Sequence, residues 1–360
     1  MRRTAAAQTA NDPFLFANGG GRRIVNFTVT NFCNAKCVFC SFPAQKAPHW
    51  VPFEEARRAI DHMVSLDVGL VSLTGGEPLL NPDLPRIAAY AKSRGLVVIS
   101  GTNGALLTRE WAAALKAAGL DALWISYESD SPDRFDRNRG VPGLTEKIRE
   151  GVQHMDAVGL NHFAIALINR AIEDVDALVR RLLELGFTTV KFDYPMSEPM
   201  SSTYLGWSDS PLLKYNAEEM EEIVNAILRV KEEGRIRVVN PVGGLEGAVD
   251  FYKDNPPKYP CYAGERILYL DTTLEYYRCP LLPERLGRVG GPVNLGRIPC
   301  NRCYYQGARD FGSFYYFLET VDLFASGRWW GDPLAAVRRA DGRLLRAAAD
   351  AMDLRRSGIQ

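Results

Sequence analysis

The sequence has no long apolar run and no excess of charge of either sign. Nowhere in its 360 residues do about eighteen apolar residues follow one another, and no apolar signal segment follows Arg2 and Arg3. Lys+Arg and Asp+Glu are equal at 43 each, so no basic surface for nucleic acid or an anionic membrane is expected. We therefore expect a cytoplasmic protein that acts on a small-molecule substrate.

The sequence also lacks a Gly-x-Gly-x-x-Gly motif, which speaks against a bound dinucleotide such as NAD. Its seven cysteines, in a long chain without a signal segment, are not expected to form a disulfide framework. They fall into two sets: Cys33, Cys37 and Cys40, then Cys261, Cys279, Cys300 and Cys303. No cysteine lies outside these sets.

The first set reads Cys-x3-Cys-x2-Cys and follows an apolar strand expected at residues 24–30. Three thiolates on one short loop can hold three irons of a [4Fe-4S] cluster and leave the fourth iron open. The alternative is a structural zinc site, with His49 as a possible fourth ligand.

The cysteine loop resembles the signature of the radical S-adenosylmethionine (SAM) superfamily, and Phe39 before the last cysteine also fits that pattern. The resemblance implies that the amino and carboxylate groups of SAM occupy the open iron. One β/α unit later, Gly75, Gly76 and Glu77 stand in a Thr-Gly-Gly-Glu-Pro run that resembles the superfamily's GGEP motif. They are therefore implied to contact the amino group of SAM.

Three later strand ends extend this resemblance. Asn103 stands in a Thr-Asn-Gly run, and Ser126 matches a serine that meets SAM in members with a second cluster. The aspartate usual two residues later is replaced by Glu128, which leaves that polar contact open. Arg139, followed by glycine, can pair with the SAM carboxylate as a fork donor, or it is a solvated loop arginine.

Strands and helices alternate along the first half of the chain. The hydrophobic pattern predicts strands at 24–30, 70–73, 96–100, 122–126, 162–168 and 188–193, and helices at 54–66, 81–94, 108–118, 144–158 and 171–185. Six such units require parallel crossovers, which predicts an α/β fold, an open partial (β/α)6 barrel. The same fold is implied by the superfamily. Ligands in such sheets bind at the carboxyl ends of the strands.

The predicted domain organisation has four parts: a tail at 1–20, the barrel at 21–235, a small module at 236–310 and helices at 311–360. A helix at 217–233 should end at Gly234, and the α/β alternation should stop there. A β-hairpin is predicted at 266–270 and 274–279 in the small module.

The second cysteine set lies in this module with the spacing Cys-x17-Cys-x20-Cys-x2-Cys. By ligand count alone, a four-cysteine zinc site is as good an interpretation of this set as an iron-sulfur cluster. The order of hairpin, Val-Asn-Leu-Gly and Cys-x2-Cys resembles the Twitch module, a short relative of the SPASM module, which carries one auxiliary [4Fe-4S] cluster. The layout from about residue 24 to 305 resembles that of the 2-deoxy-scyllo-inosamine dehydrogenases of aminocyclitol antibiotic biosynthesis.

The resemblance implies a radical SAM dehydrogenase with two clusters. With an electron from a donor such as flavodoxin or ferredoxin, SAM is cleaved to a 5′-deoxyadenosyl radical, which takes hydrogen from a carbinol carbon of a sugar or aminocyclitol. The auxiliary cluster, closed by four cysteines, accepts the remaining electron, and the product is a ketone. Asp193 and Glu198 are the candidate proton acceptors. The polar and aromatic loop at 194–209 suits a polyhydroxylated ring, although a solvated surface loop explains it equally well.

Three other functions stay open. A redox-neutral radical epimerase is disfavoured because no spare thiol can return hydrogen, although a tyrosine could substitute. A peptide-modifying or carbon-carbon bond-forming enzyme would favour a peptide-recognition domain, for which the residues before the first strand look too few. A zinc-binding protein without catalysis would be colourless, whereas an iron-sulfur protein is brown.

Overall fold

The computed structural model describes residues 23–40, 42, 47–195, 210–301, 303–304, 309–312, 314–316, 346–350 and 352. Within these residues one sheet holds ten strands in the order β10-β9-β8-β1-β2-β3-β4-β5-β6-β7. The strands are β1 Arg23–Thr30, β2 Val68–Gly75, β3 Val97–Thr102, β4 Ala122–Ser126, β5 His162–Leu167, β6 Thr189–Asp193, β7 Arg237–Val238, β8 Ile267–Leu270, β9 Glu275–Tyr277 and β10 Arg285–Arg288.

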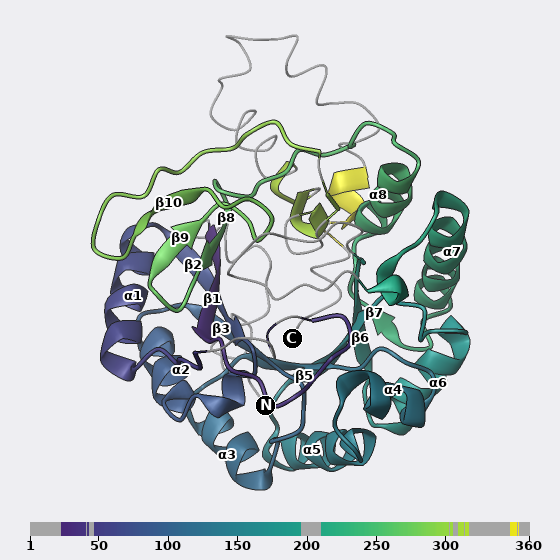
Figure 1. Ribbon diagram of the computed structural model, residues 1–360, viewed down its shortest axis with the longest axis horizontal. Helices are drawn as coiled ribbons and strands as arrows, with labels where there is room; N and C mark the ends of the chain where they lie inside the picture. Colours follow the sequence, from purple (N-terminus) through teal and green to yellow (C-terminus); the bar gives the residue numbers. More distant parts are fainter. Residues whose placement is uncertain are drawn as a thin grey trace, which may run out of the picture.

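Helices cover the outer side of this curved sheet (Figure 1). They are α1 Phe53–Ser65, α2 Leu84–Ser93, α3 Arg109–Ala117, α4 Pro132–Arg139, α5 Leu144–Val158, α6 Val175–Glu184, α7 Ala217–Glu233 and α8 Val242–Tyr252, with short 3-10 turns η4 Pro78–Leu80 and η5 Pro211–Leu213. Neighbouring strands from β8 through β1 to β7 are parallel. The predicted open partial barrel of β/α units is therefore confirmed.

Local sequence signals fix several helix boundaries. The hydroxyl of Thr108 accepts a hydrogen bond from the backbone N–H of Trp111 at the start of α3, as a cap should. At α7, Asn216 and Glu219 form a capping box, and Gly234 ends the helix with a left-handed φ of 67°. Both caps stand where the sequence predicts a helix end.

The prediction that the α/β alternation stops after Gly234 is wrong, because β7 and α8 continue it. Helix α8 has three glycines in its first turns, a composition that by itself disfavours a helix. All three are packing sites: a Cβ on Gly243 would overlap the Asp350 carboxylate, one on Gly244 the Asp310 carboxylate, and one on Gly247 the Tyr304 hydroxyl. Close tertiary packing therefore decides the conformation of this segment.

The hairpin predicted in the small module is confirmed as β8 and β9, which pair antiparallel. Strand β8 pairs in parallel with β1, with Ile24 opposite Ile267, so the hairpin extends the barrel sheet. No helix among the described residues is both long and apolar enough to cross a membrane.

Candidate active site

The Cys33–Cys40 loop follows the carboxyl end of β1 and is pinned to the end of α4. The backbone N–H of Lys36 donates to the Arg139 carbonyl at 2.8 Å, and that of Val38 donates to the Asn138 carbonyl at 2.9 Å. Helix α4 was not predicted from the sequence. These two bonds attach the cysteine loop to its last residues.

The three thiols of this loop are close enough to influence one another. Burial raises the pKa of Cys33 to about 11 and that of Cys40 to about 12, and the neighbouring Cys37 thiol raises both further. Burial also raises the pKa of Cys37, against the lowering effect of Arg139. Without a metal, these three neighbouring thiols stay protonated. Bound iron would favour their deprotonation to thiolates.

Hydrogen-bond donors already point at these sulfurs. Arg139 Nη1 lies 3.6 Å from the Cys37 sulfur, Asn103 Nδ2 lies 3.8 Å from the Cys33 sulfur, and the Ala35 N–H donates to the same sulfur at 3.5 Å. N–H donors to cluster sulfurs are one of the means by which proteins tune iron-sulfur sites. The donor set therefore fits a three-cysteine [4Fe-4S] site.

The Gly75-Gly76 pair lets the end of β2 pack directly against the cysteine loop. The Gly76 N–H donates to the Thr30 carbonyl at 2.9 Å. A Cβ on Gly76 would overlap the Phe32 carbonyl and lie 3.1 Å from the Cβ of Cys33. The cysteine loop therefore leaves no room for a side chain at Gly76. The implied contact of both glycines with SAM stays a prediction.

Glu77 lies behind the wall of the site. Its carboxylate is fully buried and accepts hydrogen bonds from the Thr102 hydroxyl and the Asn103 N–H, both at 2.7 Å. Burial raises the pKa of Glu77 to about 7, against the lowering effect of these bonds. The carboxylate thus ties the end of β2 to the end of β3, and its implied contact with SAM stays a prediction.

Arg139 and Glu128 form a buried ion pair. Arg139 Nε donates to Glu128 Oε1 at 2.7 Å, and Nη2 donates to Oε2, so the fork is bidentate. Burial alone would lower the pKa of Arg139, but Glu128 and Cys37 raise it above its ordinary value. The resemblance pairs the Arg139 guanidinium with the carboxylate of SAM. In this structure the guanidinium pairs with Glu128 instead. The replaced aspartate was the only sequence signal for Glu128.

A cavity of about 350 Å³ opens at the carboxyl ends of the strands, a size typical of small-molecule sites. It is lined by ten of the predicted site residues: Cys33, Cys37, Phe39, Cys40, Gly75, Gly76, Asn103, Ser126, Arg139 and Asp193. It also holds residues that were not predicted as site residues, among them Trp124, Glu128, Phe163, Lys191, Tyr269 and Phe311. Of these the sequence singled out only Glu128, as the replacement of the usual aspartate, because the others meet the site only through the folded chain.

Asp193 lies at the end of β6 on the wall of the cavity, and Glu198 lies outside the described residues. Within the described part of the chain, the buried Oδ1 atom of Asp193 has no hydrogen-bond partner. Burial raises the pKa of Asp193 to about 6; Lys191 opposes this, while Asp310 and Glu128 add to it. A carboxylate that titrates near neutral pH can act as a general base.

Lys191, two residues earlier on the same face of β6, brings a positive charge to this wall. Its Nζ lies 4.0 Å from Asp310 Oδ2 and 5.5 Å from the centre of the Phe311 ring. Asp310 in turn accepts hydrogen bonds from the Tyr194 hydroxyl at 3.0 Å and from Asn240 Nδ2 at 3.1 Å. Segments from three parts of the chain therefore meet beside Asp193.

The second cysteine set lies outside this cavity lining. Cys261 and Cys279 pack against the aromatic cluster that contains Tyr262 and Tyr269. Burial raises the pKa of Cys279, and the nearby Cys261 and Cys300 thiols raise it further, so both of these thiols lie close to Cys279.

All seven cysteines are free thiols, and each is partly exposed. Among the described residues, no three His, Cys, Asp or Glu side chains converge as ligands of a single metal ion. The thiolates of a four-iron cluster attach to separate irons, so their sulfurs stand farther apart than those around one ion. Ligation by either cysteine set stays a prediction.

Comparison with known proteins identifies the barrel. Residues 27–191 match the model of the radical SAM superfamily, a span that runs from β1 into β6 and includes the cysteine loop. The resemblance stated from the cysteine spacing is thus confirmed at the level of the superfamily.

Curated relatives match over the same part of the molecule. An AdoMet-dependent heme synthase of Methanosarcina barkeri is 36% identical over 137 residues, which are 36% of this chain and 38% of the relative. A probable GTP 3′,8-cyclase of Pyrobaculum aerophilum is 32% identical over 173 residues, 45% of this chain and 54% of the relative. The chain thus spans only about two fifths to a half of these relatives.

Solved structures share the fold over a longer span. AnSMEcpe with bound AdoMet aligns with a TM-score of 0.57 at 15% identity, covering 74% of this chain and 78% of that one. Streptococcus suis SuiB bound to S-adenosylmethionine aligns with a TM-score of 0.58 at 12% identity, covering 76% and 65%. At these identities the likeness shows the fold, which is the radical SAM partial barrel followed by further elements.

Proposed function

We propose that this chain, a radical SAM enzyme by virtue of residues 27–191, oxidises a carbinol carbon of a sugar or aminocyclitol to a ketone. The observation that carries the proposal is the placement of Asp193 on the wall of the same cavity as the three-cysteine loop. A dehydrogenase of this type needs a base next to the carbon from which hydrogen is taken. Antibiotic or other natural-product biosynthesis is the context in which such a substrate is expected.

When bound, the first cluster and SAM supply one-electron cleavage of SAM and a carbon radical that takes a hydrogen atom from the substrate. The chain's own residues would hold the other reactants. Cys33, Cys37 and Cys40 would ligate the cluster, and Phe39, Asn103 and Ser126 line the space in which SAM would lie. Cavity walls of this kind exclude water from a reactive intermediate.

Asp193 would remove the hydroxyl proton. Loss of a hydrogen atom leaves a ketyl radical on the substrate, whose hydroxyl is acidic, so a base with a pKa of about 6 can accept its proton at neutral pH. Lys191, on the same strand face, can hydrogen-bond the substrate oxygen. Glu198 is the second candidate base.

Atoms and electrons balance if the second cysteine set holds an oxidised cluster. The substrate would then lose one hydrogen atom, one proton to Asp193 and one electron, and Cys261, Cys279, Cys300 and Cys303 would hold the cluster that takes up this electron. The hydrogen atom would end in 5′-deoxyadenosine, with methionine as the other product of SAM, and the first electron would come from a donor such as flavodoxin or ferredoxin. No nicotinamide cofactor is required.

The first test is the iron and acid-labile sulfide content of anaerobically purified protein. Wild type should contain about eight irons, and the Cys261→Ala/Cys279→Ala variant about four, as two [4Fe-4S] clusters require. Four irons in both proteins would remove the electron acceptor and refute the dehydrogenase. Zinc in place of iron at the second set would do the same.

The second test is product formation from aminocyclitols and sugars with SAM and a chemical reductant. We expect one ketone and one 5′-deoxyadenosine per SAM, with deuterium carried from the carbinol carbon into 5′-deoxyadenosine. A product with the substrate's oxidation state would indicate an epimerase instead. GTP and a short peptide serve as comparison substrates, and turnover of either in place of polyols would refute the assigned substrate class.

A further inference from the structure

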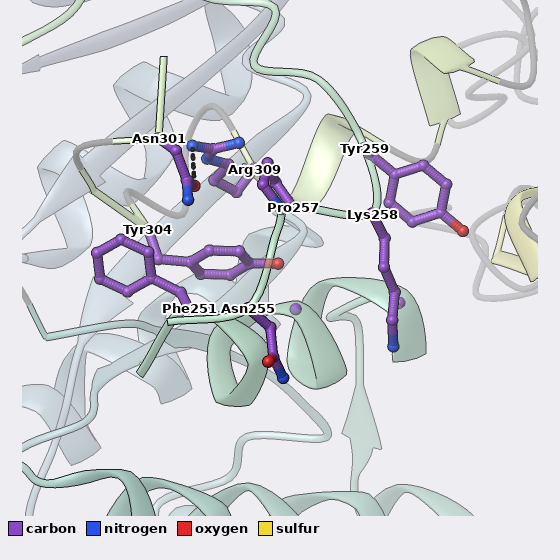
Figure 2. A pocket seen from close by; sticks show the side chains of 10 residues that line it. Phe251, Asn255, Pro257, Lys258, Tyr259, Asn301, Tyr304 and Arg309 are labelled. Carbon is purple, nitrogen blue, oxygen red and sulfur yellow. Dashed lines mark hydrogen bonds between the residues drawn. The ribbon is translucent and has the colours of Figure 1, made fainter. Parts of the chain in front are cut away.

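Arg309 is a buried arginine that closes the Cys300-x2-Cys303 turn. Its side chain is 5% exposed. Nε donates to the Cys303 carbonyl at 3.2 Å, and Nη2 donates to the Cys300 carbonyl at 3.1 Å and to Asn301 Oδ1 at 3.3 Å. Figure 2 shows the bond to Asn301 and the guanidinium beside the ring of Tyr304, whose centre is 5.9 Å from it. One side chain therefore grips the backbone of both cysteines.

Arg309 keeps one unsatisfied donor: within the described part of the chain, its buried Nη1 atom has no hydrogen-bond partner. The donors of its guanidinium that do bond meet neutral acceptors there, the carbonyls of Cys300 and Cys303 and the side-chain amide of Asn301. Arg278, next to Cys279, differs: its guanidinium is bidentate on Glu284, with Nε to Oε2 at 2.7 Å. Of these two arginines beside the second cysteine set, Arg278 is bonded to a carboxylate, whereas the described partners of Arg309 are neutral oxygens.

A buried guanidinium is stabilised by a nearby anion, and the described bonds of Arg309 all go to neutral oxygens. The small cavity next to it, about 10 Å³, has room for about one water and not for an anionic ligand. A cluster on four cysteine thiolates carries net negative charge. The cysteine turn that Arg309 grips is therefore the natural source of such an anion.

The same helical turn reaches the active-site cavity. Asp310 accepts hydrogen bonds from Tyr194 after β6 and from Asn240 after β7, and Phe311 lines the cavity. Three successive residues thus contact the second cysteine pair, the strand ends and the cavity. Arg309 is thus joined to the cavity wall through its neighbours Asp310 and Phe311.

We propose that Arg309 is the positioning residue of the second cluster, fixing the Cys300–Cys303 turn through its carbonyls and raising the cluster's reduction potential through its charge. This inference rests on the second cluster of the proposed function. Reduction adds negative charge to the cluster, and a nearby cation in a low-dielectric site favours that change. A higher potential suits a group that must accept an electron from the substrate.

The test uses anaerobic protein carrying both clusters, as wild type, Arg309→Gln and Arg309→Lys. Midpoint potentials of the two clusters are followed by electron paramagnetic resonance, and loss of the second cluster to an iron chelator is timed. We expect Arg309→Gln to lower the second potential, to leave the first unchanged and to speed iron loss. Arg309→Lys should keep most of the potential, because it keeps the charge, but should still lose iron faster, because one ammonium cannot span both carbonyls.

Arg285→Gln is the matched control, because Arg285 lies in the same module, is exposed and pairs with Glu275. It should leave both potentials unchanged. An unchanged second potential in Arg309→Gln would overturn the inference. If Arg309→Gln does not retain the second cluster, the test rests on Arg309→Lys. Iron loss from Arg309→Lys at the wild-type rate would then overturn the role of Arg309 in holding the two cysteine carbonyls. Wild-type protein with only four irons would instead refute the proposed function and this inference together.

Discussion

Replacing Asp193 by asparagine should stabilise the protein and remove its activity. The pKa of Asp193 is about 6, whereas its usual value is 3.8. Each unit of difference corresponds to about 1.4 kcal/mol, so the ionised carboxylate destabilises the folded state by up to about 3 kcal/mol. Solvent in the cavity that Asp193 lines reduces this figure, and we expect about 1–3 kcal/mol.

The sign follows from the proton balance. Between the unfolded pKa and the folded pKa of about 6, the folded state binds more protons, so stability falls as the pH rises through this window. Above it the full penalty applies to wild type and not to Asp193→Asn. The variant should therefore unfold at a higher temperature than wild type at pH 7.5, and the gap should narrow at pH 5.5.

Activity should change in the opposite direction. Ketone formation by wild type should fall about tenfold per pH unit well below pH 6, because the base is then protonated. Asp193→Asn should lose at least about 100-fold in ketone formation and keep both clusters. Cleavage of SAM without substrate oxidation should persist.

The assays are anaerobic thermal unfolding at the two pH values and the pH profile of ketone formation. Asp133→Asn is the control, because Asp133 is exposed in the first turn of α4 and should change neither. A variant less stable than wild type at pH 7.5 would refute the argument that the ionised Asp193 carboxylate, whose Oδ1 atom has no hydrogen-bond partner among the described residues, destabilises the fold. A wild-type rate that falls only near pH 4 would refute Asp193 as the base.

Two further predictions concern the walls of the site. Gly76→Ala should displace the cysteine loop, because the new Cβ would overlap the Phe32 carbonyl, and should lower the iron content of the first cluster. Gly296→Ala is the control and should keep the wild-type iron content, because a Cβ there meets nothing within 4 Å. Equal iron contents in the two variants would contradict the packing argument. Glu128→Gln should leave the buried guanidinium of Arg139 without its counter-charge and destabilise the fold by about 3–5 kcal/mol in anaerobic thermal unfolding. A loss below about 1 kcal/mol would show that the pair is solvated.

The sequence by itself determined the first six strands of the barrel and the place of the first cysteine loop after β1. Alternation of apolar segments fixed the order of strands and helices, and parallel crossovers follow from that order. Because parallel strands end at one edge, residues that follow different strands, such as Cys33, Asn103 and Asp193, were predictably brought to one cavity. Caps such as Thr108 were also readable, since a cap acts within one turn.

Only the tertiary structure decided what each polar group faces. Glu128 and Arg139 are eleven residues apart along the chain. Their ion pair occupies the Arg139 guanidinium, which the resemblance assigned to the carboxylate of SAM. Arg309 and Lys191 carry no sequence signal, because their roles depend on elements that meet only after folding. Helix α8 shows the same limit: local propensity opposes a glycine-rich helix, and close packing against Asp310 and Tyr304 outweighs it.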